Sequence, residues 1–169
     1  MYILETPRLA LRHLVPEDAA DLYRIYSDPE TMKFMGKAPA SVGEERGNIL
    51  SHIANHYDLR GVGLWATILQ GRGELVGRCG LMRKLIGGAE EVEIAYLLGR
   101  EYWGRGLATE AAGAILRLGF EAYGFRRIVA VIDPANAASI RVAEKLGMSY
   151  EREVTYGNCG EVSLYASEA

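Results

Sequence analysis

The sequence has 169 residues, of which 49% are hydrophobic and 24% are charged. This length and composition suit a single globular domain, residues 1–169, with a core of its own. The formal net charge of −3 gives no sign of the basic surface that binds nucleic acid or an anionic membrane. No apolar run approaches the ~20 residues of a membrane span, and the first residues lack the apolar run of a signal peptide, so we expect a cytoplasmic protein.

The cysteines and histidines give little reason to expect a metal ion. Cys79 and Cys159 lie far apart and lack the spacing of metal ligands. His52 and His56 are four residues apart and would share one face of a helix, but no third ligand lies nearby. We interpret this pair as a solvated helix face and expect no metal.

The first part of the chain predicts one strand, two helices and a meander of three strands. Pro16 suits the first turn of a helix that ends before Asp28. Ser41 and Glu44 have the spacing of a capping box, which would open a second helix. We expect its inward residues to be Ile49, Leu50, Ile53 and Tyr57. Glycine-rich turns separate the strands, which we place at 9–14, 64–69, 74–82 and from 92 onward.

The second part predicts a helix, a strand, a second helix and two final strands. Gly124 can end the first of these helices, and Gly147 the second, which begins near 137. The strands fall at 127–132, 148–155 and 161–166, and the turn at 157–160 links the last two. This order indicates an α+β fold with a mixed sheet of about seven strands.

The stretch from Val92 to Phe120 is the one around which the chain is organised. An alternating strand leads through Gly99, Gly104 and Gly106 into residues with the apolar period of a helix. Glycines before a helix N-terminus let an anion approach unpaired backbone N–H groups, so the pattern predicts a phosphorylated cofactor. It fits neither a P-loop nor a dinucleotide-binding fingerprint, because the required lysine or third glycine is missing.

The segment from Trp103 to Ala111, WGRGLATEA, resembles the acetyl-CoA loop of the GNAT N-acetyltransferases, whose usual form is Q/R-x-x-G-x-G/A. Trp at the first position is typical of the branch of ribosomal-protein N-terminal acetyltransferases. Other motifs resemble that branch in the same order along nearly the whole chain: Glu5-Thr6-Pro7-Arg8-Leu9, Pro16-Glu17-Asp18-Ala19, Ser27-Asp28-Pro29-Glu30, Gly77-Arg78-Cys79-Gly80, and Asn136 with Ser139 through Gly147.

The resemblance implies a sheet that splays after its fourth strand, with the pantetheine arm of acetyl-CoA between the fourth and fifth strands. Backbone N–H groups at Leu97 and Leu98 would then bind the thioester carbonyl and its oxyanion. The pyrophosphate would be held by the segment Gly104, Arg105, Gly106, Leu107, Ala108 and Thr109. Alternatively the glycines form an ordinary turn with a solvated arginine, and Thr109 caps the helix.

Two residues are candidates for proton transfer. Strand alternation puts Glu93 on one face with Ala95 and Leu97, where it could take a proton from the incoming ammonium or orient the substrate. By resemblance, Ser139 would protonate the CoA thiolate and Asn136 would contact the pantetheine arm. The same residues suit a simpler interpretation in which Glu93 is solvated and Asn136 caps a helix. A tyrosine such as Tyr150 could replace Ser139 as the acid.

The sequence thus predicts an acetyl-CoA-dependent N-acetyltransferase that works by direct attack in a ternary complex. The acceptor that we expect is the α-amino group of a protein N-terminus. The alternatives are a small amine, such as a polyamine, an amino acid or an antibiotic, and a module that binds acetyl-CoA without turnover. We expect a monomer or a homodimer.

Overall fold

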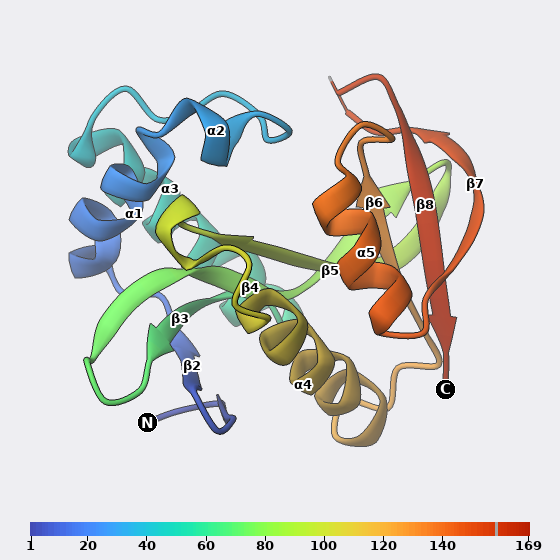
Figure 1. Ribbon diagram of the computed structural model, residues 1–169, viewed down its shortest axis with the longest axis horizontal. Coiled ribbons are helices and arrows are strands. Elements are labelled where there is room, and N and C mark those ends of the chain that lie inside the picture. The colour runs from blue at the N-terminus through green and yellow to red at the C-terminus, as the bar shows by residue number, and fades with distance from the viewer. Residues whose placement is uncertain (158) are drawn as a thin grey trace.

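The computed structural model describes residues 1–157 and 159–169. The predicted turn at 157–160 therefore includes one position, Asn158, that lies outside the described residues. The strands are β1 (Leu4–Glu5), β2 (Leu9–His13), β3 (Leu64–Leu69), β4 (Glu74–Ile86), β5 (Ala89–Leu98), β6 (Arg127–Ile132), β7 (Ser149–Thr155) and β8 (Glu161–Glu168) (Figure 1). The α-helices are α1 (Ala19–Tyr26), α2 (Pro29–Met32), α3 (Val42–His52), α4 (Leu107–Glu121) and α5 (Ala137–Lys145).

Across the described residues, the eight strands form one sheet in the order β1-β2-β3-β4-β5-β6-β8-β7. Neighbouring strands are antiparallel except for β5 and β6, which are parallel. The predicted α+β class and mixed sheet are confirmed. The extra strand relative to the expected seven is β1, whose two residues are too few to show a period in the sequence.

The sheet divides between β5 and β6. These strands pair only at Glu93 and Val129, whereas β5 pairs with β4 as far as Leu98. Figure 1 shows the end of β5 running toward α1 and α3 while β6 stays beside α5 and β8. The predicted splay is therefore present, and it leaves the end of β5 without a partner strand on one edge in the described structure.

An ion-pair network joins four strands at the closed end of the splay. Arg127 of β6 lies with its Nε 3.2 Å from both carboxylate oxygens of Glu91 on β5. Its Nη1 lies 2.8 Å from Glu151 of β7 and 3.6 Å from Glu168 of β8. The hydrogen bond to Glu151, with that to Glu91, raises the Arg127 pKa above its ordinary value despite partial desolvation. The network thus fixes the point from which the two halves diverge.

Both faces of the sheet are covered. α4 packs on one face, where its core includes Leu107, Ala111 and Ile115. α1 and α3 cover the opposite face of β3, β4 and β5 with Leu22, Ile25, Tyr26 and Ile49. A third cluster, Ile86, Val129, Val154, Val162 and Leu164, fills the β7–β8 side. No helix in the described chain has the length and apolar character needed to cross a membrane.

The end of the second predicted helix differs from the expectation. α3 is followed by a π-helical segment, Ile53–Asp58, which changes the phase of the inward face. Within α3 itself, the buried residues Glu45 and Ile49 are one turn apart on one face, and the predicted inward residue Leu50 lies beside that face and is 50% exposed. Tyr57 is half-buried as expected, and its hydroxyl donates to the Leu64 carbonyl.

The glycines of the Gly77-to-Gly80 motif allow β4 to lie close to neighbouring backbone. A Cβ at Gly77 would lie 2.1 Å from the Leu97 carbonyl oxygen on β5. A Cβ at Gly80 would lie 2.0 Å from the Gly63 carbonyl oxygen. Both contacts are with backbone, which cannot move aside as a side chain can.

We predict that Gly80→Ala lowers the free energy of unfolding by about 1–3 kcal/mol or more, the range for overpacked cores. The matched control is Gly47→Ala in α3, where a Cβ would meet no atom within 4 Å. That change should raise stability by roughly 0.5–1 kcal/mol, because alanine favours a helix interior. Urea denaturation of both variants checks this, and a Gly80→Ala protein as stable as the wild type would contradict it.

Candidate active site

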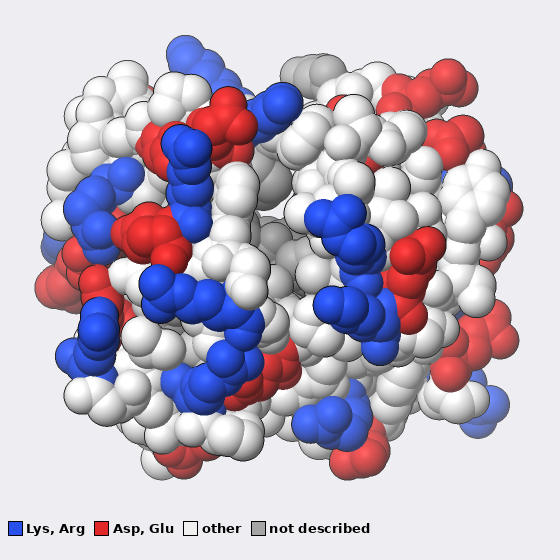
Figure 2. Space-filling view, in the orientation of Figure 1, with Lys and Arg blue, Asp and Glu red and all other residues white. Residues whose placement is uncertain are grey.

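A cavity of about 540 Å³ opens where β5 and β6 part. Its walls come from α2 and the segment after it, the end of β5, the loop before α4, the first turn of α4, the loop after β6, and α5. Figure 2 shows the hollow between the two halves of the molecule, with Lys and Arg side chains on both sides of it. Segments far apart in the sequence therefore meet around one space.

Most of the predicted site residues line this cavity. They are Leu97, Leu98, Gly104, Gly106, Leu107, Ala108, Thr109, Asn136 and Ser139. Two predicted residues, Arg105 and Glu93, do not. The guanidinium of Arg105 lies 5.9 Å from the centre of the Tyr102 ring, and the side chain is exposed.

The loop before α4 ends in a left-handed residue. Gly106 is the N-cap of α4 with φ of 75°, a conformation that side-chain-bearing residues rarely adopt. The first backbone bond of the helix runs from the Glu110 N–H to the Gly106 carbonyl, 3.0 Å. The N–H groups of the first turn, from Leu107 to Thr109, therefore have no partner within the helix. The expectation that Thr109 caps the helix is wrong, because Gly106 takes the cap position without a side-chain bond.

The end of β5 presents backbone toward the cavity. The Gly99 N–H donates to the Val76 carbonyl of β4, 2.9 Å. The backbone N–H and C=O groups of successive strand residues point to opposite edges of the strand. Because those of Gly99 point to β4, those of Leu98 point into the gap. Its carbonyl accepts a hydrogen bond from Nε1 of Trp103, 2.8 Å. The Leu98 N–H is thus the better placed of the two predicted oxyanion donors, since the Leu97 backbone faces β4.

Asn136 caps α5, as the simpler interpretation expected, and Asn136 and Ser139 both lie at the cavity. Oδ1 of Asn136 accepts from the Ser139 N–H, 3.2 Å, and so caps α5. Both residues also line the cavity, and among the described residues Asn136 Nδ2 and Ser139 Oγ donate to no acceptor. The Ser139 carbonyl accepts from the Tyr96 hydroxyl, 2.9 Å. Tyr150, the rival acid, is 54% exposed and lies outside the cavity lining.

Glu93 lies deeper, at the point where the sheet divides. It is 5% exposed, so the solvated interpretation is wrong. Its Oε2 accepts from the Tyr156 hydroxyl, 2.7 Å, and lies 3.0 Å from Nζ of Lys84, which also contacts the Tyr156 hydroxyl. Burial, reinforced by Glu93, raises the Tyr156 pKa above its ordinary value, so Tyr156 remains a donor. Glu93 is four residues, about 13 Å, along β5 from Leu97.

Sequence reasoning missed the partners of Glu93 and part of the cavity wall. Lys84 and Tyr156 lie in different strands or turns, and no local pattern connects them to Glu93. Arg141 and Lys145 also line the cavity from α5. Their four-residue spacing puts them on one helix face, a signal that could have been read beside Asn136 and Ser139.

The charge of the cavity wall is mainly positive. Its lining contains one carboxylate, Glu30, and three cations, Lys33, Arg141 and Lys145. Arg141 and Lys145 are on the α5 side, whereas Glu30 and Lys33 are in or next to α2. The α5 side therefore suits an anion, whereas the positive and negative charges on the α2 side nearly balance.

The two neighbouring histidines are structural in this fold. The rings of His52 and His56 stack with their centres 4.5 Å apart, and both residues are half-buried, so the solvated interpretation is wrong. Nε2 of His52 accepts from the Leu64 N–H, 2.8 Å. Burial, with the positive charge nearby, lowers the His52 pKa to about 4. Within the described residues there is no group of three or more metal-ligating side chains.

Comparison with known proteins gives the family. The family profile described as "Acetyltransferase (GNAT) domain" matches residues 8–149. The chain is 37% identical over 157 residues to "Uncharacterized protein YkkB" of Bacillus subtilis, covering 92% of this chain and 90% of that protein. It is similar to the crystal structure of a GNAT acetyltransferase from Bacillus anthracis, with a TM-score of 0.83, 26% identity, and coverage of 99% and 98% of the two chains.

Two further matches have names that state an acceptor. The chain is 25% identical over 147 residues to spermidine N(1)-acetyltransferase of Escherichia coli, covering 86% of this chain and 75% of that protein. RimL, described as a ribosomal L7/L12 α-N-protein acetyltransferase and solved with coenzyme A, has a TM-score of 0.82 at 20% identity, covering 99% and 98% of the two chains. At that identity the likeness to RimL is one of fold.

Proposed function

The chain belongs to the GNAT family of N-acetyltransferases, and on that premise we propose that it transfers the acetyl group of acetyl-CoA to the α-amino group of a protein N-terminus. The observation that carries the proposal is the cavity between β5 and β6, which joins the N-terminus of α4 to an α2 side where the charges of Glu30 and Lys33 nearly balance. The first feature suits the donor. The second suits an acceptor with a single ammonium group.

On this proposal the donor spans the cavity from α4 to β5. The N–H groups of Gly106 to Thr109 bind the pyrophosphate, since a helix N-terminus favours an anion. Asn136 uses its free Nδ2 for an amide of the pantetheine arm while Oδ1 keeps capping α5. The Leu98 N–H donates to the thioester oxygen and more strongly to the oxyanion of the tetrahedral intermediate.

The acceptor nitrogen loses two protons in the reaction, and the departing thiolate gains one. Glu93 takes the proton of the acceptor ammonium through water, using Oε1, which accepts no bond from the described residues. The neutral amine forms a bond to the thioester carbon, and the intermediate then breaks its bond to sulfur. Ser139 gives its proton to the departing thiolate and regains one from the positively charged nitrogen of the intermediate, so that the products are the neutral amide and the CoA thiol. Lys84 and Tyr156 fix the position of Glu93 through Oε2.

The choice of acceptor rests on charge. A spermidine site has to bind several ammonium groups in one molecule, for which several carboxylates are expected. The cavity wall offers one, Glu30, and it is accompanied by Lys33. A peptide N-terminus brings one positive charge. The sequence likeness to the E. coli spermidine enzyme makes spermidine the second candidate.

The test is acetyl-CoA turnover, followed by release of the CoA thiol, with peptides that differ only at the N-terminus. Peptides with a free α-amino group should be acetylated with kcat/KM at least about tenfold above that for spermidine, a difference of about 1.4 kcal/mol in transition-state binding. The control is the same peptides blocked at the N-terminus but with a lysine side chain. Faster turnover of spermidine, or equal turnover of blocked peptides, would contradict the proposed acceptor.

We predict that Ser139→Ala lowers kcat by about ten- to a hundredfold, the range for loss of a positioned acid. Stability should change little, because the oxygen that caps α5 belongs to Asn136. Asn136→Ala is the control: it should lower the free energy of unfolding by about 1 kcal/mol through loss of the cap. A Ser139→Ala enzyme with the kcat of the wild type would exclude Ser139 as the acid.

A further inference from the structure

We infer that Arg8 is a positioning residue for the donor: it fixes the peptide between Arg105 and Gly106 so that the Gly106 N–H faces the phosphate-binding side of the cavity. The inference rests on the proposed function, since it concerns how the loop before α4 binds the pyrophosphate. Arg8 precedes β2 and is separated from Arg105 by 97 positions, more than half of the chain. No pattern in the sequence connects the two.

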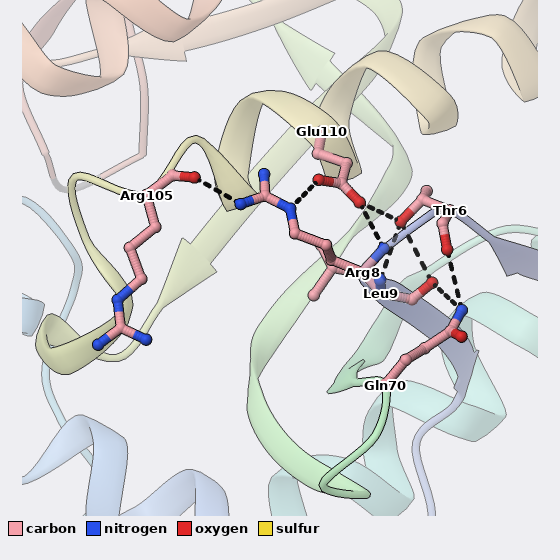
Figure 3. Close-up of polar contacts among 6 residues, drawn as sticks. All are labelled: Thr6, Arg8, Leu9, Gln70, Arg105 and Glu110. Atoms are coloured by element: carbon pink, nitrogen blue, oxygen red, sulfur yellow. Dashed lines mark hydrogen bonds and ion pairs between the residues drawn. The ribbon is translucent and has the colours of Figure 1, made fainter.

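The contacts place Arg8 against the outer side of the loop. Its Nη1 donates to the Arg105 carbonyl, 2.8 Å, and its Nε donates to Oε2 of Glu110 in the first turn of α4, 2.6 Å (Figure 3). A Cβ at Gly106 would lie 3.6 Å from Nη2 of Arg8. One planar guanidinium thus joins the loop to the helix that follows it.

The geometry of the peptide bond links this contact to the direction of the Gly106 N–H on the other side of the loop. In a trans peptide the C=O and the following N–H point in opposite directions, and the described chain has no cis peptide. Because the Arg105 carbonyl points to Arg8, the Gly106 N–H points away from Arg8. Gly106 lines the cavity and Arg8 does not. The N–H is therefore held toward the space where a phosphate would lie.

Arg8 is itself held by a network around Glu110. Oε1 of Glu110 accepts from the Thr6 hydroxyl, 2.6 Å, and from the Arg8 N–H, 2.9 Å. Gln70 Nε2 donates to the carbonyls of Thr6 and Leu9, 2.9 and 3.0 Å (Figure 3). Burial alone would raise the Glu110 pKa, but the hydrogen bonds from Thr6 and Arg8 outweigh it and the pKa is lowered. The carboxylate is therefore charged at neutral pH.

The contacts of Arg8 are better explained by a role in positioning the loop before α4 than by a contribution to the stability of the fold. The Arg8 side chain is 48% exposed, and exposed ion pairs add little to stability. What arginine provides is a rigid fork that reaches a carboxylate and a carbonyl at once. A lysine can reach only one of them with the same geometry.

The test compares two donors with the same thioester and the same arm, acetyl-CoA and acetyl-pantetheine, which lacks the pyrophosphate. In Arg8→Lys we expect kcat/KM for acetyl-CoA to fall about tenfold through KM, and kcat/KM for acetyl-pantetheine to stay within about twofold of the wild type. The matched control is Arg46→Lys, because Arg46 also forms an exposed ion pair, with Glu17, and does not line the cavity. It should leave kcat/KM for both donors within about twofold of the wild type.

An equal loss on both donors in Arg8→Lys would overturn the inference and leave the proposed function standing. A wild-type enzyme that does not turn over acetyl-CoA would overturn the proposed function, and the role of Arg8 with it. If Arg8→Lys does not fold, Glu110→Gln tests the same connection, because it loosens Arg8 without removing it. It should also lower kcat/KM for acetyl-CoA more than kcat/KM for acetyl-pantetheine. An equal loss of kcat/KM with both donors would again overturn the inference.

Discussion

The active-site geometry depends on one place in the backbone, the single pair of residues, Glu93 and Val129, at which β5 and β6 meet. Beyond that pair the ladder stops, and the backbone groups at the end of β5 need other partners. The cavity occupies the resulting gap, with the N-termini of α4 and α5 at its rim. Donors that a continuous sheet would use internally are thereby available to a ligand.

Below the gap, an ion-pair network and an apolar cluster join the two halves of the sheet. Arg127 connects β5, β6, β7 and β8 through three carboxylates, and an apolar cluster that includes Ile86, Val129 and Leu164 packs beside it. Glu93, Lys84 and Tyr156 lie at the same junction. The candidate catalytic carboxylate is therefore fixed by the elements that hold the two halves together, and this explains its distance from the cavity wall.

The sequence predicted the elements well, because alternation, helical periods and glycine turns are local signals. It predicted the splay and the cavity-lining residues through the family resemblance. It could not predict that Lys84 and Tyr156 meet Glu93, because that contact depends on how distant strands pack. It misplaced Leu50, because the inward face of α3 is the one that carries Glu45 and Ile49, and a buried glutamate is not expected from its residue type. For Asn136 the spacing was ambiguous for a physical reason: one amide can cap a helix with its oxygen and still offer its nitrogen to the cavity.

The hydrogen bond from Trp103 to the Leu98 carbonyl changes which polar groups the end of β5 presents to the cavity. Each strand residue normally offers a neighbour one donor and one acceptor. The indole occupies one of the two lone pairs of the Leu98 carbonyl, whereas the Leu98 N–H is left to a ligand. A ligand there is distinguished by the lone pairs it brings, which a thioester oxygen has and a hydrocarbon lacks. At Leu98 the edge of β5 therefore favours a group that accepts a hydrogen bond, because an aromatic side chain from the neighbouring loop already binds the carbonyl.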